Sequence, residues 1–510
     1  MRNDNFAVSK YSLAELKRLL VKYSEAPEHV VRRKMQVSHL DKHLKSLGAR
    51  TIVAERKYVD RHFLDDYAAY YAYCWHEYKP VCARLHFFDI EFGGDHDART
   101  ATLETFLRGE GVREDSRASN LKDCYLGYMV VKPLPEAIIG RTCLRLHPPE
   151  GFFRCTRRCP ANAFGVEFEV QSIAFQEQDK VAAACATSAL WSVFQGSGTV
   201  LHHHIPSPVE ITKAAARYEP VDVLPDAGLT IGQMSQVIRD VGKLEPHCFE
   251  VPFRDQEHRL FFKTVVYTYL HIVPLILTVN IPEVDGTEGW HAVAVVGCRL
   301  GIEKPEPWPD TGFLIKASCM DEIYVHDDQV GPFTPMSIKD SCLTTAWPGG
   351  RAEPGEVLFP LRSMIRISVR RILDLLIRFD AWLEILRVKG LLSLEDRLVW
   401  DIYPTLQSDL KKEIRGSKCA TPKCRRDILQ AFISKFLWRA VAYCSGNPVF
   451  ELLFDATDVE LHTGFWPVEY KPILSEHCAV IKYLKNAHPN LLEAVFKIVD
   501  RRFIQRLCEL

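Results

Sequence analysis

The stretch WHAVAVVGCRL (residues 290–300) predicts a β-strand with a histidine, His291, at its beginning. The apolar run after the histidine is expected to be buried, with the ring left at the strand end. A second, nearly continuous apolar run, VPLILTVNIP (273–282), predicts another buried strand. The stretch DEIYVHDDQVGPF (321–333) predicts a strand that runs into a turn and ends at Asp327. His291 and Asp327 are therefore each expected at the end of a strand.

The stretch QDKVAAACATSALW (178–191) surrounds Cys185 with small residues. We expect a helix that begins at Cys185 and ends at Gly196. A helix start favours a thiolate, because the helix dipole stabilises negative charge there. The small neighbours Ala184 and Ala186 would leave room for a substrate backbone.

These elements supply the four parts that a thiol hydrolase needs. Cys185 is the candidate nucleophile, and His291 could share its proton. Asp327 could hold the histidine tautomer. Gln178, just upstream of the cysteine, could donate an amide hydrogen to an oxyanion.

Each of these residues also has an ordinary structural interpretation. Free cysteine is among the most buried residue types, so Cys185 alone would indicate a core thiol. The order of its partners along the chain favours a nucleophile instead. Asp328 competes with Asp327, and strand alternation favours Asp327. Gln176 competes with Gln178, and both could be solvated.

The ordered set of motifs resembles the papain-like cysteine peptidases, particularly the bacterial branch related to the bacteriocin-processing peptidase domains. The motifs are QDKVAAAC, GWHAVAVVGC and YVHDDQVG, which lie within about residues 165–340. The resemblance implies a papain-like α+β domain with a triad of Cys185, His291 and Asp327.

Two features depart from the family pattern. Six residues lie between Gln178 and Cys185, one more than is usual, and Asp179 occupies the usual glutamine position. Either the loop carries an extra residue or the oxyanion donor is lost. Alanines also replace the aromatic or glycine residue next to the family's cysteine.

The chain of 510 residues is too long for one core, because single cores seldom exceed roughly 250–300 residues. The stretch WPGGRAEPGE (347–356) is the strongest candidate for a linker. We therefore expect a papain-like peptidase domain at 161–346, flanked by an N-terminal α+β region at 1–160 and a mainly helical, mixed α/β region at 357–510. The fold class expected for the whole is α+β.

The net charge of -1 implies no general attraction to nucleic acid or to an anionic membrane. We find no apolar run of about 18 residues and no export signal. The 16 cysteines are scattered singly, as in a protein of the reducing cytoplasm with free thiols. We expect a cytoplasmic, bacterial protein with no nucleic-acid or membrane partner.

Metal and cofactor motifs are weak or absent in the sequence. Three adjacent histidines on an extended chain cannot easily converge on one metal, and isolated cysteine pairs supply only half of a zinc site. Phosphate-binding glycine patterns and HExxH are absent. We therefore predict no cofactor and no metal, and an ordinary exposed side chain at His326. The weak candidates are His202–His204, Cys155 with Cys159, Cys419 with Cys424, and Asp455 with Asp458.

The sequence thus favours a cysteine hydrolase that cleaves a peptide or isopeptide bond in a protein or peptide substrate. The same triad also serves transglutaminases and deamidases, which remain an alternative. A catalytically inactive papain-like shell that binds a partner is the second alternative.

Overall fold

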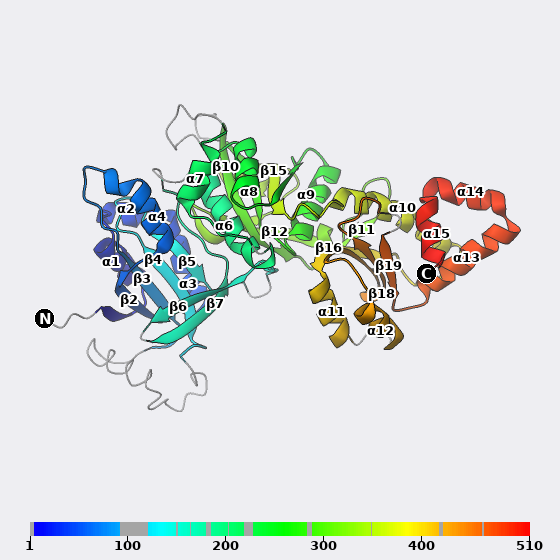
Figure 1. Ribbon diagram of the computed structural model, residues 1–510, viewed down its shortest axis with the longest axis horizontal. Coiled ribbons are helices and arrows are strands. Elements are labelled where there is room, and N and C mark those ends of the chain that lie inside the picture. The colour runs from blue at the N-terminus through cyan, green and yellow to red at the C-terminus, as the bar shows by residue number, and fades with distance from the viewer. Residues whose placement is uncertain are drawn as a thin grey trace. The chain divides into compact units, whose positions relative to one another are not determined.

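The computed structural model describes residues 5–91, 121–148, 151–163, 165–179, 185–201, 203–218, 228–282, 288–347, 349–417, 422–461 and 464–509. They form a mixed α and β fold (Figure 1), as expected for the α+β class. The chain divides into two compact units. Unit 1 comprises Met1–Glu250, Val273–Arg299 and Glu322–Pro360, and unit 2 comprises Val251–Ile272, Leu300–Asp321 and Leu361–Leu510. The two units do not coincide with the three consecutive regions expected from the sequence, because the chain passes several times from unit 1 to unit 2 and back.

The first sheet of unit 1 is built from the N-terminal part of the chain. Its strands follow sequence order: β1 (Phe6–Lys10), β2 (Thr51–Tyr58), β3 (Cys82–Phe88), β4 (Tyr125–Val131) and β5 (Ile139–Leu144). All neighbouring pairs are antiparallel. Three helices, α1 (Leu13–Tyr23), α2 (Glu28–Arg33) and α3 (Met35–Ser46), share a hydrophobic core with this sheet. Ser12 caps α1, because its hydroxyl accepts from the Glu15 amide at 3.1 Å.

The second sheet of unit 1 carries the three strands predicted around the histidine. Its order is β13 (Gly331–Ser337), β12 (Met320–Asp327), β10 (Glu288–Leu300), β9 (Leu275–Pro282), β15 (Arg351–Leu361) and β14 (Leu343–Thr344), with β8 (Glu245–Glu250) paired to β15. β9 and β10 are antiparallel, with His291 opposite Val279. The strand predictions at 273–282 and 290–300 and the strand running into a turn at 321–333 are confirmed.

The remaining elements of unit 1 are mostly helices. They are α4 (Arg61–Ala69), η1 (Tyr71–Tyr73), the hairpin of β6 (Arg157–Ala163) and β7 (Val166–Ser172), α6 (Cys185–Leu201), α7 (Pro208–Ala215) and α8 (Ile231–Asp240). The prediction that Gly196 ends α6 is wrong, since the helix continues through it to Leu201. A Cβ at this position would lie 2.3 Å from the Pro274 ring and 3.0 Å from the Cys155 carbonyl oxygen. The glycine therefore allows close packing rather than a helix end.

The prediction of a linker at 347–356 is also wrong. Residues 351–361 form β15, which pairs with β9 in the middle of the second sheet. The pairing register shifts between Pro354 and Val357, and a Cβ on Gly355 would lie 2.7 Å from the Trp290 ring. Proline and glycine here mark a bulge and a close approach, which produce the same sequence signal as a linker.

Unit 2 surrounds a five-stranded sheet of order β11 (Leu314–Ile315), β16 (Val399–Leu406), β17 (Phe436–Cys444), β18 (Asn447–Asp455) and β19 (Phe465–Glu469). The sequence analysis expected a mainly helical, mixed α/β region at 357–510, and the structure places four strands of this sheet there, β16 to β19. The helices are α9 (Gln256–Tyr269), η3 (Lys316–Cys319), α10 (Val369–Val388), α11 (Gln407–Gly416), α12 (Pro422–Gln430), α13 (Ile473–Ala487), α14 (Pro489–Ile498) and α15 (Arg501–Glu509).

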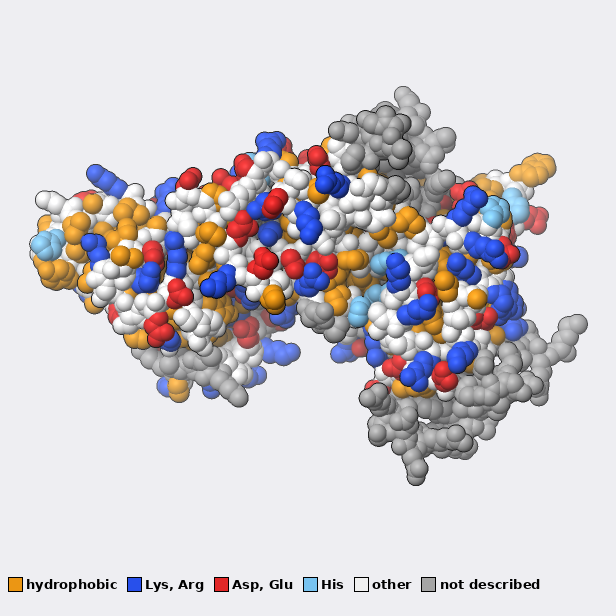
Figure 2. Space-filling view, turned by 180° about the vertical axis from the view of Figure 1, so that it is seen from behind, with side chains coloured by type: hydrophobic (Ala, Val, Ile, Leu, Met, Phe, Trp, Pro, Cys, Tyr) orange, Lys and Arg blue, Asp and Glu red, His pale blue; other side chains and the backbone are white. Residues whose placement is uncertain are grey.

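Charged side chains of both signs are interspersed over the face seen in Figure 2, in line with the net charge of -1. None of the helices that the structure describes has the length and apolar character needed to cross a membrane.

The helix that begins at Cys185 is fixed to the N-terminal part of unit 1. The Trp191 side chain of α6 is fully buried, and its indole N–H donates to His62 Nδ1 of α4 at 2.8 Å. Burial lowers the pKa of His62 to about 3, so its ring is neutral and can accept this bond. The N-terminal region is therefore part of the scaffold that holds Cys185.

We predict that Trp191→Phe lowers the free energy of unfolding by about 1–3 kcal/mol, because it leaves buried His62 Nδ1 without its donor. Urea denaturation followed by circular dichroism measures the change. Trp75→Phe is the matched control, since Trp75 is fully exposed and its replacement should stay within about ±0.5 kcal/mol. Equal effects of the two changes would contradict a structural role for the Trp191–His62 bond.

Candidate functional site

The structure brings three of the four predicted residues together within unit 1. Cys185 is the first residue of α6 and is half-buried. His291 lies near the start of β10, and Asp327 is the last residue of β12. Both are buried, with 5% and 0% of their surface exposed. Because β10 and β12 are neighbours in the sheet, their ends meet beside the start of the helix.

The imidazole of His291 lies between a thiol and two carboxylates. Its Nε2 is 3.3 Å from Asp327 Oδ1 and 3.5 Å from Asp328 Oδ1. The ring also forms a hydrogen bond with the Cys185 thiol. Since Nε2 faces the carboxylates, Nδ1 is the ring nitrogen left for the sulfur. This arrangement allows a proton to be shared between Cys185 and His291 while the carboxylates hold the ring.

The electrostatics of this cluster favour a protonated histidine. Burial by itself would lower the pKa of His291, but the hydrogen bonds to Asp327 and Cys185 and the charge of Asp328 outweigh it and raise that pKa well above its usual value. Burial raises the pKa of Asp328 to about 7, and the charge of Asp327 adds to this while His291 opposes it. These contacts favour the protonated form of His291.

Asp327 and Asp328 both lie within 3.5 Å of His291 Nε2. The alternation of side chains along a strand, which was expected to point only one of them toward the histidine, does not apply here. The β12–β13 register shifts between Val325 and Asp327, which interrupts the alternation that the sequence pattern assumes. Asp327 Oδ1 also accepts from the Gln329 amide at 2.9 Å. Asp327 makes the shorter contact to Nε2, as predicted, and Asp328 is a second member of the site.

Trp347 is a site residue that the sequence did not reveal. Its ring meets His291 edge-on, with centroids 5.0 Å apart and planes at 83°. Only 6% of its surface is exposed, so it covers the histidine from solvent. The residue stands at the beginning of the stretch predicted as a linker, where no local pattern connects it to His291.

Gln178 does not join the other three residues in the described part of the chain. Its half-buried side chain lines a cavity of about 480 Å³ together with Lys34, Tyr71 and Tyr78. None of the contacts described for Cys185, His291 or Asp327 involves it. Residues 180–184, which connect it to Cys185, lie outside the described residues.

Asp179 cannot replace a glutamine as an amide donor. Its carboxylate accepts from the Tyr71 hydroxyl at 2.5 Å and lies 3.9 Å from the Lys132 ammonium. It is buried, with 4% of its surface exposed. An acceptor-only group held in this way serves to fix the loop rather than to bind an oxyanion.

The N-terminal helices position this loop and the aspartate turn. Lys34, directly before α3, pairs with buried Glu177, whose second carboxylate oxygen accepts from the Ile139 amide at 3.1 Å. Gln36 donates from Nε2 to the carbonyl oxygen of Asp328 at 2.8 Å. Lys34 and Glu177 are 143 positions apart and Gln36 and Asp328 are 292 apart, so no local sequence motif could have shown these two contacts.

Two smaller predictions about the site are corrected. Ala186 is packed in the core with 1% of its surface exposed, so it does not line open space for a substrate, while Ala184 lies outside the described residues. His326 was expected to be exposed but is buried between Phe175 and Phe333. Burial lowers the pKa of His326 to about 3, so it is neutral and structural.

Two clusters of the described residues have ligand atoms within 4.8 Å of one another and could hold a metal ion: His291 with Asp327 and Asp328, and His477 with Cys478 and Cys508. In the first cluster, Nε2 and the two carboxylates are the ligand atoms. The hydrogen bond between the same ring and Cys185 favours proton sharing over metal binding there. The weaker candidates Cys419 and Cys424 lie outside what the structure describes of side chains.

No protein-family model matches this chain, and no curated protein matches it. The papain-like resemblance rests on the sequence motifs alone.

We predict that Asp327→Asn lowers the pKa of His291 more than Asp328→Asn does, because it removes the hydrogen bond as well as a charge. The midpoint should move by about 1–3 pH units. NMR of isotope-labelled histidine measures it, with neutral His326 as the internal control. A larger effect of Asp328→Asn would make Asp328 the main partner.

The raised pKa also sets the pH dependence of stability. Because the pKa of His291 is higher in the folded than in the unfolded protein, protonation of His291 stabilises the fold. This stabilisation is fully present below about pH 6.5, the usual pKa of histidine, and is lost as the pH rises through the pKa of His291 in the folded protein. The difference in stability between the wild type and His291→Ala should therefore decrease with rising pH.

Proposed function

We propose that the protein is a cysteine hydrolase that cleaves a peptide or isopeptide bond in a protein or peptide substrate. The observation that carries the proposal is the His291 ring, which contacts Cys185 on one side and Asp327 on the other. A buried cysteine–histidine–carboxylate series is the arrangement that activates a thiol for attack on a carbonyl. No cofactor is needed for this chemistry.

The proposed reaction has two stages. The Cys185 sulfur attacks the carbonyl carbon, and the imidazolium of His291 gives its proton to the leaving amine, so that a thioester remains. Neutral His291 then takes a proton from water, and the resulting hydroxide attacks the thioester to release the acid and the Cys185 thiolate beside the restored imidazolium. Asp327 holds the ring orientation throughout, and the oxyanion is held by the Cys185 backbone amide and Gln178.

One observation favours a non-enzymatic alternative. Asp179, at the usual glutamine position, is an acceptor tied to Tyr71, and Gln178 takes part in none of the contacts that the described part of the chain gives for Cys185, His291 and Asp327. A papain-like shell that binds a partner without turnover would tolerate both features. Enzymes that transfer the acyl group to an amine, or that deamidate glutamine, would use the same three residues.

We predict that Cys185→Ala abolishes cleavage of a complex peptide library, by at least about 10³-fold, and leaves the unfolding midpoint unchanged. Mass spectrometry of the library identifies cleaved peptides. It also detects products with an added amine or a deamidated glutamine, which would establish transferase or deamidase activity instead. Undiminished turnover by Cys185→Ala would contradict the proposal.

Iodoacetamide labelling, mapped to individual peptides at neutral pH, provides an assay without a substrate. Cys185 beside a protonated histidine should react faster than Cys248. Cys248 is the matched control because it is more exposed, while burial and nearby acids raise its pKa to about 11. Equal rates at these two thiols would favour the inactive shell.

Gln178→Ala tests the oxyanion donor. If its amide acts in the transition state, kcat should fall by about 10²–10³-fold with little change in KM. The rate at which iodoacetamide labels Cys185 should not change, because the thiol and His291 remain in place. Gln176→Ala is the neighbouring control, and an equal loss from both variants would indicate a general disturbance of the loop.

A further inference from the structure

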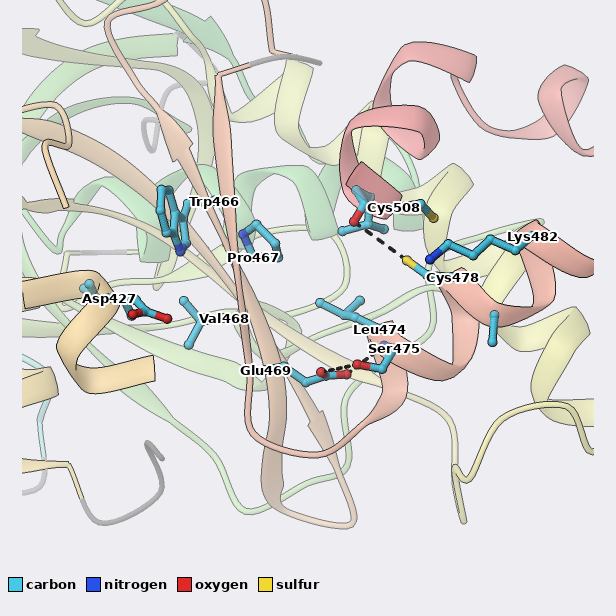
Figure 3. A pocket seen from close by; sticks show the side chains of 13 residues that line it. Asp427, Trp466, Pro467, Val468, Glu469, Leu474, Ser475, Cys478, Lys482 and Cys508 are labelled. Carbon is cyan, nitrogen blue, oxygen red and sulfur yellow. Dashed lines mark hydrogen bonds between the residues drawn. The ribbon is translucent and has the colours of Figure 1, made fainter. Parts of the chain in front are cut away.

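A second group of reactive side chains lies in unit 2, far along the chain from the residues of the proposed triad. His477 and Cys478 are on α13, and Cys508 is on α15. Their ligand atoms are within 4.8 Å of one another. Both cysteines are half-buried and line a cavity of about 600 Å³ (Figure 3), so small molecules in solution can reach them.

The tautomer of His477 is fixed by its surroundings. Its ring is completely buried, and Nε2 accepts a hydrogen bond from the indole N–H of Trp382 at 3.1 Å. An indole nitrogen can only donate, so Nε2 must carry a lone pair and the proton of the neutral ring must be on Nδ1. Nδ1 faces the Cys478 sulfur at 3.9 Å and therefore donates to it.

This tautomer disfavours a metal ion at the same place. A metal would need the lone pair of Nδ1, and the proton would then move to Nε2, where it would meet the Trp382 N–H. Lys482, whose side chain extends over Cys478 in Figure 3, adds a positive charge that opposes a cation. Within the described residues the cluster also has three ligands, one fewer than a structural zinc site requires.

The same contacts favour a thiolate on Cys478. Its sulfur accepts a hydrogen bond from the Cys508 thiol and another from His477, and the Lys482 charge acts in the same direction. Together they outweigh burial and lower the pKa of Cys478 to about 5, whereas the pKa of Cys508 is raised, mainly by its bond to Cys478. When protonated, Cys478 can instead donate to the Leu507 carbonyl, 3.7 Å away.

We propose that Cys478 and Cys508 form a redox-active dithiol, in which Cys478 is oxidised by a hydroperoxide and Cys508 closes a disulfide with it. The Cys478 thiolate attacks one oxygen of hydrogen peroxide and the O–O bond breaks. With one proton from solvent this yields a sulfenic acid and water. The Cys508 sulfur then attacks the sulfenic sulfur and displaces hydroxide, which takes the Cys508 proton and leaves as water. Two electrons pass from the two thiols to the peroxide.

The chain provides its own matched control in unit 1. Cys143 and Cys159 also form a hydrogen-bonded pair, but 1% and 2% of their surfaces are exposed. Peroxide cannot reach them in the folded protein. If the Cys478–Cys508 pair is oxidised faster than the Cys143–Cys159 pair, the difference is due to accessibility and to the contacts with His477 and Lys482. The closeness of two cysteines would not explain it, because both pairs are close.

The test treats the full chain with hydrogen peroxide and then blocks the remaining thiols with N-ethylmaleimide before digestion without reductant. Mass spectrometry should find the Cys478 and Cys508 peptides joined, with Cys143 and Cys159 alkylated after denaturation. Cys508→Ser should leave Cys478 as a sulfenic acid that dimedone traps, and Cys478→Ser should leave Cys508 unoxidised. Oxidation of Cys478 should be at least about tenfold faster than that of exposed Cys248, because an ordinary thiol is only a few per cent ionised at neutral pH.

Lys482→Gln is an exposed change that should not affect folding, and it should slow oxidation of Cys478 severalfold. Three results would overturn the proposal. They are a Cys478 that reacts no faster than Cys248, equal oxidation of the buried Cys143 and Cys159, or one equivalent of zinc retained through dialysis and lost in Cys508→Ser. The last result would establish a metal site instead. Since no readout uses hydrolysis, failure here leaves the proposed function untouched.

Discussion

The buried imidazole of His291 is the constraint on which the arrangement of the site residues in unit 1 depends. Removing an imidazolium from water is costly unless opposite charge and hydrogen bonds compensate it. His291 is compensated by Asp327, Asp328 and the Cys185 sulfur, which come from a strand end, the following turn and a helix start. The order of β9, β10 and β12, the bulge in β12 and the contact from Gln36 all bring these groups to one ring. Each group contributes to this compensation, so the loss of any one leaves the buried ring with fewer partners.

The sequence predicted those parts of the site whose signal is local. Continuous apolar runs identified β9 and β10, with His291 near the start of β10, and Asp327 was expected at the end of the next predicted strand, which is β12. Asp328 was considered as a competitor of Asp327, whereas Trp347 and Gln36 could not be found in this way. Trp347 lies in a bend before β15 and Gln36 in α3, so both meet the site only through the tertiary fold.

Glycine and proline caused the errors at Gly196 and at 347–356, for the same physical reason. The sequence analysis expected Gly196 to end a helix and the glycines and prolines of 347–356 to form a linker between domains. In both places the small or constrained residue permits a close approach, to Pro274 and to Trp290 respectively. Glycine and proline occur both where a helix or domain ends and where two segments pack closely. Their presence alone therefore does not distinguish a boundary from a close contact.

His291 and His477, both among the described residues, meet their cysteines in different ways. Carboxylates beside His291 favour its protonated form, whereas the indole N–H of Trp382 donates to His477 Nε2 and leaves the proton on the nitrogen that faces sulfur. The two reactions that we propose, acyl transfer at Cys185 and oxidation at Cys478, would rely on these different partners.

The division into compact units follows the chain in an unusual way. Unit 2 takes in the segment before β9, the segment between β10 and β12, and the chain after Pro360. The strands that carry His291 and Asp327 thus continue covalently into unit 2. Neither unit exists as one uninterrupted piece of polypeptide, so a simple truncation cannot isolate either of them. Each must be completed by segments that are synthesised after parts of the other.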